Sequence, residues 1–354
     1  MSKKIDSYQY FYRILDVDVC LRSEKIELFN LFMDDYDWFR TKYLSNENIL
    51  DFSITSYNGK DELVVLPYND IYDISAHPSP NNYIYQIILR ELFDKFKDFF
   101  VLHAGVVSID ENVLAISGSQ GIGKTTFILE LLKNNCIFFS DDFCPIHKAT
   151  KLVYPFPRNL WIKNKNKKNP IRIKELSSAI SDIPQKLKWL ICLKEINNKN
   201  DFCHIEVILK DEDNCFIQEL YKIGYITINN SFNENFPLLS ISYPKGRGIT
   251  LKIKELLKKH KDNIWNFYRI DRNAPPDFLK EAELKAMSTN DAAFFLLHEL
   301  KSKVSLDNID IKPMSVFMKL FEILEGIQCY SLNVGKIESM RKLVLSLING
   351  KMEV

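Results

Sequence analysis

Apolar residues follow two patterns along the chain: a helical spacing, which predicts helices, and short continuous runs, which predict strands. In residues 81–99 they recur at helical spacing on one face, at Ile84, Ile87, Ile88 and Leu92. The runs FFVLHAGVVSI and NVLAIS that follow are short and apolar, joined by Asp-Glu-Asn at 110–112, which is typical of a turn. TTFILELLKNN then predicts a helix and CIFFS a short buried strand. This order of strands, loop, helix and strand predicts an α/β fold.

The remaining pattern predicts two parts. Residues 1–80 mix aromatic and polar residues with β-like runs such as ELVVLPY, which predicts a strand-rich N-terminal module. The second part, 81–354, continues with strand candidates in KWLICLKEI, HIEVILK and GYITINN. From about residue 275 it is expected to be helical, with Ser288 three residues before Asp291 as an N-terminal cap. Further helices are expected in MSVFMKLFEILEG, ending at Gly326, and in IESMRKLVLSLI.

Composition excludes several classes of protein. The chain has 354 residues, 46% of them hydrophobic, and its 47 Lys and Arg balance 46 Asp and Glu, so no general attraction to nucleic acid or membrane is expected. None of the seven cysteines forms a C-x-x-C pair, which favours reduced thiols over a disulfide frame. No signal peptide and no apolar run near the roughly 18 residues of a membrane span is found. We therefore expect a cytoplasmic protein, and a homo-oligomer is compatible with the sequence.

The segment GSQGIGKT fits the pattern G-x-x-x-x-G-K-[ST], a P-loop. Its backbone N–H groups converge on phosphate oxygens, and the next helix directs its partially positive N-terminus at the same phosphates. We therefore expect nucleotide binding by these residues: Gly118, Ser119, Gln120, Gly121, Ile122, Gly123, Lys124, Thr125 and Thr126. Lys124 would reach the β- and γ-phosphates and Thr125 would hold Mg²⁺. The alternative is a glycine-rich turn with an exposed lysine.

Two adjacent carboxylates, Asp141 and Asp142, follow the strand CIFFS. In an open α/β sheet, ligands bind beyond the carboxyl ends of the strands. One carboxylate can serve a metal ion while the other accepts a proton from an attacking hydroxyl. Asp141 is predicted as the metal-side residue and Asp142 as the base, with the reverse assignment left open. The alternative is that they cap a turn.

His103 ends the apolar run FFVL, before Ala104 and Gly105. A histidine beside a strand is usually structural. If this run lies beside the P-loop strand, however, the imidazole lies near the same sheet edge as the two aspartates.

Other charged residues are weaker candidates. Arg158 and Arg247 could supply positive charge to phosphate oxygens, or lie on the surface beside proline-rich turns. Glu195 is a rival metal-linked carboxylate. The basic run at 163–174, KNKNKKNPIRIK, is either a solvated loop or a clamp for an acidic substrate. The remaining histidines show no ligand spacing, so no transition-metal site is predicted: His77, His147, His204, His260 and His298.

Together these features resemble the HPr kinase/phosphorylase family, whose phosphate-site architecture is shared with PEP carboxykinases. The resemblance rests on about 45 residues from His103 to Ile146: the histidine, GSQGIGKT, a helix and a strand ending in Asp-Asp. It implies a P-loop kinase core of the HPr kinase/PEP carboxykinase type, with a strand-rich N-terminal module and a helical C-terminal part. The size and divergent N-terminal module are similar to HPr-kinase-like peptide kinases of peptide-modification gene clusters, including lasso-peptide kinases.

The resemblance implies an ATP- and Mg²⁺-dependent kinase with Asp142, Asp141, His103 and Lys124 as catalytic residues. The expected acceptor is a serine or threonine hydroxyl of a peptide or small protein. The family usually has an acid and a serine at the positions of Ser119 and Gln120, and its downstream substrate signature is missing here, so HPr is not the expected acceptor. A small-molecule kinase with the same core and a non-catalytic nucleotide-binding regulator remain alternatives.

Overall fold

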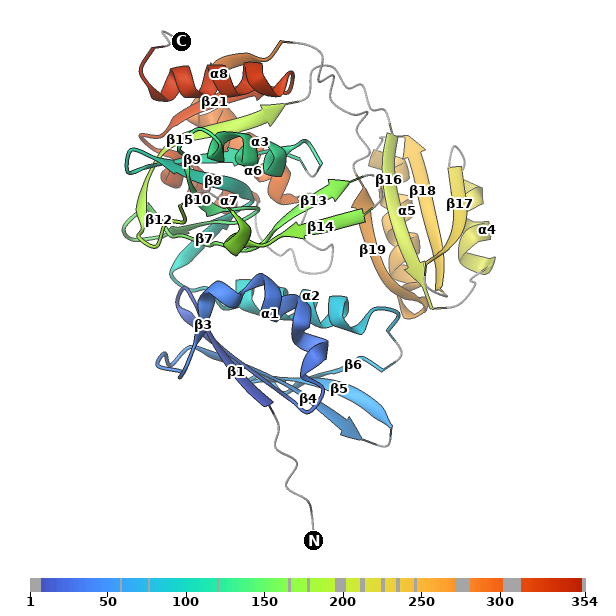
Figure 1. Cartoon of the computed structure of the whole chain (residues 1–354). Coiled ribbons are helices and arrows are strands. Elements are labelled where there is room, and N and C mark those ends of the chain that lie inside the picture. The colour runs from blue at the N-terminus through green and yellow to red at the C-terminus, as the bar shows by residue number, and fades with distance from the viewer. Residues whose placement is uncertain are drawn as a thin grey trace. The chain divides into compact units, whose positions relative to one another are not determined.

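The computed structural model describes thirteen stretches of the chain: 8–57, 59–75, 77–119, 121–164, 167–176, 179–194, 202–210, 214–223, 227–233, 236–244, 247–270, 281–301 and 313–351. The chain forms two compact units (Figure 1). The first comprises Met1–Gly118, Gly123–Lys194 and Leu279–Val354, and the second Ser119–Ile122 and Glu195–Phe278. The predicted boundary near residue 80 lies inside the first unit and stays a prediction. The fold is mixed α/β with several sheets, as the sequence predicts at this level.

The N-terminal part of the first unit is a six-stranded sheet of order β3-β1-β2-β4-β5-β6. Its strands are β1 (Tyr8–Ile14), β2 (Val17–Ser23), β3 (Arg40–Thr41), β4 (Ile49–Tyr57), β5 (Lys60–Leu66) and β6 (Asp70–Asp73). Between β2 and β3 lie α1 (Asn30–Asp35) and two 3₁₀ turns, Ile26–Phe29 and Asp37–Phe39. The strand-rich character predicted for this part is therefore found.

Helix α2 (Pro80–Lys95) packs on this sheet, close to the predicted range of 81–99. Its buried face carries the four apolar residues whose spacing predicts it: Ile84, Ile87, Ile88 and Leu92. These side chains join one core with Phe29, Phe32 and Phe52, so the amphipathic pattern is explained by burial against the sheet.

A nine-stranded sheet forms the rest of the first unit, with the path β10-β8-β9-β15-β12-β11-β7, and β21 and β20 branching from β15. Its strands are β7 (Phe99–Leu102), β8 (Ala104–Ile109), β9 (Asn112–Ser117), β10 (Ile137–Ser140), β11 (Cys144–His147), β12 (Leu152–Val153), β15 (Gln185–Lys194), β20 (Glu283–Met287) and β21 (Gln328–Asn333). Strand β15 is parallel to both β9 and β21. Strand β8 is antiparallel to both β9 and β10, so β9 and β10 run in the same direction.

Four helices accompany this sheet: α3 (Lys124–Leu132), α6 (Thr289–Lys301), α7 (Pro313–Leu324) and α8 (Ile337–Ile348). Helices α6 and α7 share a core with the sheet in which Leu190 and Cys192 of β15 meet Ala292 and Leu296. The predicted N-terminal cap of α6 is confirmed: Asp291 N–H donates to Ser288 Oγ at 3.1 Å, and Ser288 Oγ donates to Asp291 Oδ2 at 2.7 Å. The C-terminal part contains the three helices expected there, α6, α7 and α8, and also the strands β20 and β21, which the expectation of a helical part does not include.

The segment FFVLHAGVVSI, which the sequence predicts as one strand, is broken at His103 into β7 and β8. The opposing strand is broken too, at residues 141–143, between β10 and β11. Strand β7 pairs with β11, and β8 with β10. Ser140 pairs with Val106 and Cys144 with Leu102, so the two breaks lie opposite each other. The condition that FFVL runs beside the P-loop strand is not met, since β8 is the neighbour of β9. The imidazole of His103 nevertheless lies near Asp142, as the condition is meant to imply.

The basic run at 163–174 does not form a simple loop. Its backbone contributes to a two-stranded hairpin of β13 (Leu160–Asn164) and β14 (Lys167–Ile171), in which Trp161 pairs with Pro170. A 3₁₀ turn, Ile173–Glu175, follows.

The second unit has its own sheet of order β17-β18-β16-β19 and its own core. Its strands are β16 (Phe202–Leu209), β17 (Thr227–Asn233), β18 (Phe236–Pro244) and β19 (Ile264–Ile270), and its helices are α4 (Asn214–Ile223) and α5 (Arg247–Lys259), with a 3₁₀ turn at Lys261–Asn263. Val207 and Leu239 of the sheet pack with Phe216 of α4 and Ile253 of α5. This unit is a sheet with two helices packed in a separate core.

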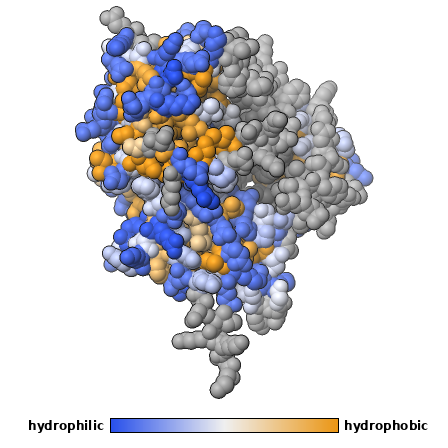
Figure 2. Space-filling view, viewed as in Figure 1, coloured by the Kyte–Doolittle hydropathy of each residue, from blue (hydrophilic) through white to orange (hydrophobic). Residues whose placement is uncertain are grey.

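Figure 2 shows apolar residues gathered over the part of the first unit that holds the nine-stranded sheet, bordered by hydrophilic residues. Within the described stretches, no helix is both long and apolar enough to cross a membrane.

Candidate active site

The loop between β9 and α3 has the backbone that its glycines make possible. Gly121 has φ 84° and Gly123 φ 103°, a region that residues with a side chain rarely adopt. Ile122 N–H donates to Ser119 O at 3.3 Å, which closes a tight turn before the helix. Gly118 is buried, and Gln120 lies outside the described residues. The strand–loop–helix order that the motif requires is therefore found, and nucleotide binding by the loop stays a prediction.

Lys124, the first residue of α3, is only 5% exposed. Its Nζ donates to Gly118 O at 2.8 Å, so the amine turns back over the loop. An ammonium group is costly to bury unless oxygen atoms surround it. A phosphate at the loop would supply such oxygens.

Thr125 and Asp141 form the closest polar pair of the site. The Thr125 hydroxyl lies 2.9 Å from Asp141 Oδ2 and 3.2 Å from Oδ1. Asp141 is 3% exposed, and burial, with the adjacent Asp142, raises the pKa of its carboxyl to about 7, against the opposing effects of Thr125, Arg158 and Lys124. Among the residues that the structure describes, Asp141 has no ion-pair partner. A hydroxyl beside a buried carboxylate is an oxygen donor set that suits Mg²⁺, so these two residues fit the predicted metal site.

Asp142 and His103 meet across the two strand breaks. Asp142 adopts φ 69°, and Ala104 N–H donates to its backbone O at 3.2 Å. This left-handed backbone is uncommon for residues other than glycine and turns the side chain out of the strand pattern. His103 Nε2 lies 3.8 Å from Asp142 Oδ1, and the carboxylate is 39% exposed. Asp142 is therefore the more accessible of the two aspartates, and His103 is its neighbour.

The close packing of the site depends on Gly105. A Cβ at this position would lie 2.8 Å from Ile128 Cγ1 of α3 and 3.6 Å from Asp141 Oδ1. The helix therefore approaches β8 so closely that only glycine fits. Ser117 Oγ also donates to His103 O at 3.0 Å, which ties the end of β9 to the start of β8. These contacts bring the loop, the aspartates and the histidine to one edge of the sheet.

Arg158 is placed by contacts that no spacing in the sequence predicts. Its Nη2 lies 2.9 Å from Asp35 Oδ2 of α1 and donates to Tyr85 Oη of α2 at 3.1 Å, while its guanidinium lies 4.9 Å from the ring centre of Phe143. Burial lowers the pKa of Arg158, but Tyr36, Tyr85, Asp35 and Asp142 outweigh it, so the pKa lies above its ordinary value and the group stays charged. Its role as a phosphate contact stays a prediction.

Four further predictions, for Thr126, Arg247, Glu195 and the basic run, have no described side-chain contact with this edge. Thr126 is exposed on α3. Arg247 begins α5 in the second unit, and its side chain lies outside the described residues, as do Glu195 and the lysine side chains of the basic run. Their proposed roles stay predictions.

The structure corrects the expectation that the histidines form no ligand cluster. In the second unit, ligand atoms of Cys215, Glu219 and His260 lie within 4.8 Å of one another. Cys215 and Glu219 are four residues apart on α4, and His260 follows α5, which explains why spacing alone does not reveal the cluster. Lys259 Nζ lies 2.7 Å and 2.9 Å from the two Glu219 oxygens. Because the Lys259 ammonium already balances the Glu219 carboxylate, the cluster is not proposed as a metal site.

No protein-family model and no curated protein matches the chain. Among solved structures, the chain is similar to an Hpr(Ser) kinase/phosphatase from Coxiella burnetii, with 16% sequence identity and a TM-score of 0.24. The match covers 46% of this chain and 96% of that chain. At this identity and TM-score, the match assigns neither a fold nor an activity to the chain.

Proposed function

We propose that the protein is an ATP- and Mg²⁺-dependent kinase that transfers the γ-phosphoryl group to a serine or threonine hydroxyl of a peptide or small protein. One observation carries the proposal: Asp141 contacts the hydroxyl of Thr125 at 2.9 Å, directly beside the glycine loop, while Asp142 and His103 adjoin it. A nucleotide-binding switch would need the loop and a metal ligand. It would not need a second, more exposed carboxylate with a histidine beside it.

Each residue has a separate task in this proposal. The loop amides and Lys124 bind the phosphates, and Thr125 and Asp141 hold Mg²⁺, which would offset negative charge on the phosphoryl oxygens. Asp142 accepts the proton of the acceptor hydroxyl as its oxygen bonds to the γ-phosphorus and the bond to the leaving ADP oxygen breaks. His103, when protonated, keeps the Asp142 carboxyl ionised and fixes its orientation.

The peptide acceptor is proposed from the sequence resemblance and from the exposure of Asp142. A carboxylate that is 39% exposed is open to a hydroxyl presented on a chain. The oligomeric state and the cytoplasmic location expected from the sequence stay predictions.

The proposal is tested by incubating the protein with Mg-ATP labelled at the γ-phosphate and a library of serine- and threonine-containing peptides. Mass spectrometry should find products heavier by one phosphoryl group, and Lys124→Ala should yield none. If small polyols but no peptides gain the label, the small-molecule alternative replaces the peptide acceptor. If ATP binds and no acceptor is ever labelled, the protein is a nucleotide-binding regulator.

A further inference from the structure

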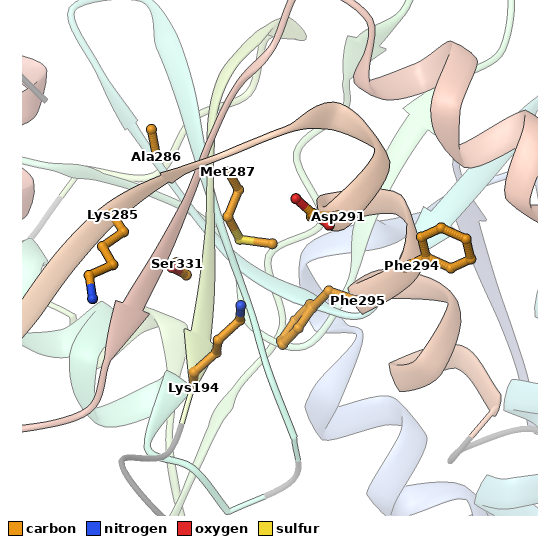
Figure 3. Close-up of a pocket in the computed structure, with 8 residues that line it drawn as sticks. All are labelled: Lys194, Lys285, Ala286, Met287, Asp291, Phe294, Phe295 and Ser331. Carbon is orange, nitrogen blue, oxygen red and sulfur yellow. The ribbon is translucent and has the colours of Figure 1, made fainter.

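A cavity of about 520 Å³ lies in the first unit, between the ends of β15, β20 and β21 and the first turns of α6. Its lining combines apolar side chains with polar groups (Figure 3): Lys194, Lys285, Ala286, Met287, Asp291, Phe294, Phe295 and Ser331. This volume suits a small molecule of nucleoside size, and mixed lining of this kind is typical of ligand sites.

The position of the cavity follows from the sheet register. Cys192 of β15 pairs in parallel with Ser117 of β9, which directly precedes the glycine loop. Lys194, two residues further along β15, therefore ends its strand beside the start of the loop. Asp141 follows β10, which lies on the other side of β9, beyond β8. The cavity and the aspartates thus flank the loop strand from opposite sides.

This arrangement sets the direction of a nucleotide bound at the loop. The γ-phosphate must face the aspartates, because the transfer occurs there under the proposed function. The cavity beside β15 lies on the side of the loop strand away from the aspartates, where the nucleoside end would lie. We propose that the cavity beside Lys194 binds the adenosine part of the phosphoryl donor; this inference rests on the proposed kinase function.

The side chains of the cavity suit a nucleoside. The Met287 side chain, the Phe295 ring and the Lys194 amine converge from β20, α6 and β15, whereas Phe294 projects away from them (Figure 3). A thioether and an aromatic ring offer flat apolar contact to a base. The Lys194 amine and the Ser331 hydroxyl can bond to ring nitrogens and ribose oxygens.

The polar groups at the rim have defined partners. Asp291 accepts the Ser288 hydroxyl at 2.7 Å and keeps lone pairs for ribose hydroxyls. Lys285 Nζ lies 2.8 Å from Glu283 Oε1, so its charge is already balanced. Lys194 is consequently the cation assigned to the ligand, and Lys285 is not.

The test compares the binding of Mg-ATP with that of Mg-tripolyphosphate by calorimetry. In Phe295→Ala and in Lys194→Ala, the Kd for Mg-ATP should rise about tenfold, the size expected for loss of base stacking or of a good polar contact. The Kd for Mg-tripolyphosphate should change less than about twofold in both. Lys194 is exposed, so its variant keeps the test valid if Phe295→Ala does not fold. Lys336→Ala, which removes an exposed lysine paired with Glu281 outside the cavity, is the matched control.

The outcomes separate this inference from the proposed function. If the wild-type protein binds neither ligand, the proposed kinase function fails. If it binds both and the two variants weaken neither or weaken both equally, the cavity is not the nucleoside site. If the variants weaken only a labelled acceptor peptide, the cavity is an acceptor site and the inference is overturned.

Discussion

Two buried aspartates of the first unit, Asp35 and Asp141, differ in what surrounds them. Asp35, at the end of α1, is 1% exposed. Its Oδ2 lies 2.9 Å from Arg158 Nη2 and accepts a hydrogen bond from the Tyr85 hydroxyl at 2.5 Å. Asp141, 3% exposed after β10, has the Thr125 hydroxyl but no ion-pair partner among the described residues. The first carboxylate contacts a cation of the fold, whereas the second contacts a hydroxyl.

We interpret Asp35 as a structural carboxylate and Asp141 as a carboxylate available for catalysis. Removing one partner of a buried ion pair is destabilising, because the other partner is left as an uncompensated buried charge. Burial raises the pKa of both carboxyls, but among the described residues only Asp35 has a cation in direct contact. Groups with raised pKa values cluster at functional sites. Asp141 is the residue where the fold leaves charge to be balanced from outside, by the proposed Mg²⁺ ion.

The largest effect is expected at the loop itself. Lys124→Ala should reduce phosphoryl transfer below detection, because an ammonium at the γ-phosphate contributes several kcal/mol, roughly 3 or more, to the transition state. The rate of labelled product formation checks this. Lys133→Ala, at the other end of α3 where the amine lies 2.9 Å from Glu130, should keep wild-type rates. Normal transfer by the Lys124 variant would falsify the P-loop assignment.

A smaller effect is expected for the histidine beside Asp142. His103→Ala should lower kcat by roughly 10²- to 10⁴-fold with little change in Mg-ATP affinity, because the imidazole assists the proton acceptor rather than the nucleotide. His103→Gln should restore part of the activity through a hydrogen bond.

The control for His103 is His147→Ala. His147 ends β11, and its ring packs against those of Phe99 and Tyr154. That variant should lower the Tm and leave kcat unchanged. The same pattern in His103→Ala, a lower Tm with normal kcat, would remove His103 from the site.

The two aspartates should respond with opposite signs to replacement by asparagine. Asp35→Asn should destabilise the protein by about 3 kcal/mol, because it leaves Arg158 buried without its carboxylate. Asp141→Asn, measured at about pH 8 without divalent metal, should stabilise it by about 1–3 kcal/mol, because a buried charge is removed. Denaturant unfolding of both variants provides the measurement.

The stabilising effect of Asp141→Asn should depend on pH in a defined direction. Burial raises the pKa of Asp141 to about 7, so the folded state holds its proton more tightly than the unfolded chain, whose carboxyl titrates near about pH 4. Stability of the wild type should therefore fall as the pH rises between about 4 and 7, and the difference from the variant should vanish near about pH 4. A pH-independent difference would mean that Asp141 is not desolvated.

The smallest effect is expected for the basic run. Replacing Lys165, Lys167 and Lys168 by serine should raise the KM for an acidic peptide a few-fold at low salt and leave the KM for ATP unchanged. The reason is that such charges act mainly by attracting the peptide electrostatically, an effect that salt screens. Unchanged peptide kinetics at low ionic strength would return these lysines to the role of solvated surface residues.

Local patterns account for what the sequence predicts well. The spacing of Ile84, Ile87, Ile88 and Leu92 predicts α2 because one face of one helix is buried. The glycine loop and the end of β10 are recognisable because each lies within a short segment. Their order along the chain is therefore enough to predict that Lys124, Thr125 and Asp141 lie near the same sheet edge.

Contacts between distant segments explain what the sequence does not reveal. Strand β20, with the sequence ELKAM, consists largely of residues that favour helices, and only pairing with β21 makes it a strand. Arg158 meets Asp35 and Tyr85 across more than 70 residues, so no spacing connects them. The break at His103 lies opposite the break in the paired strand, and neither segment alone reveals that match.

Calorimetry of ATP binding with and without Mg²⁺, on the wild type, Asp141→Asn and Asp35→Asn, tests most directly whether Asp141 is the carboxylate kept for the metal. Wild-type protein and the Asp35 variant, at a temperature where both are folded, should bind ATP more tightly with Mg²⁺. Asp141→Asn should lose that dependence on Mg²⁺ while it still binds ATP through the loop. Equal Mg²⁺ dependence in all three proteins would contradict the account.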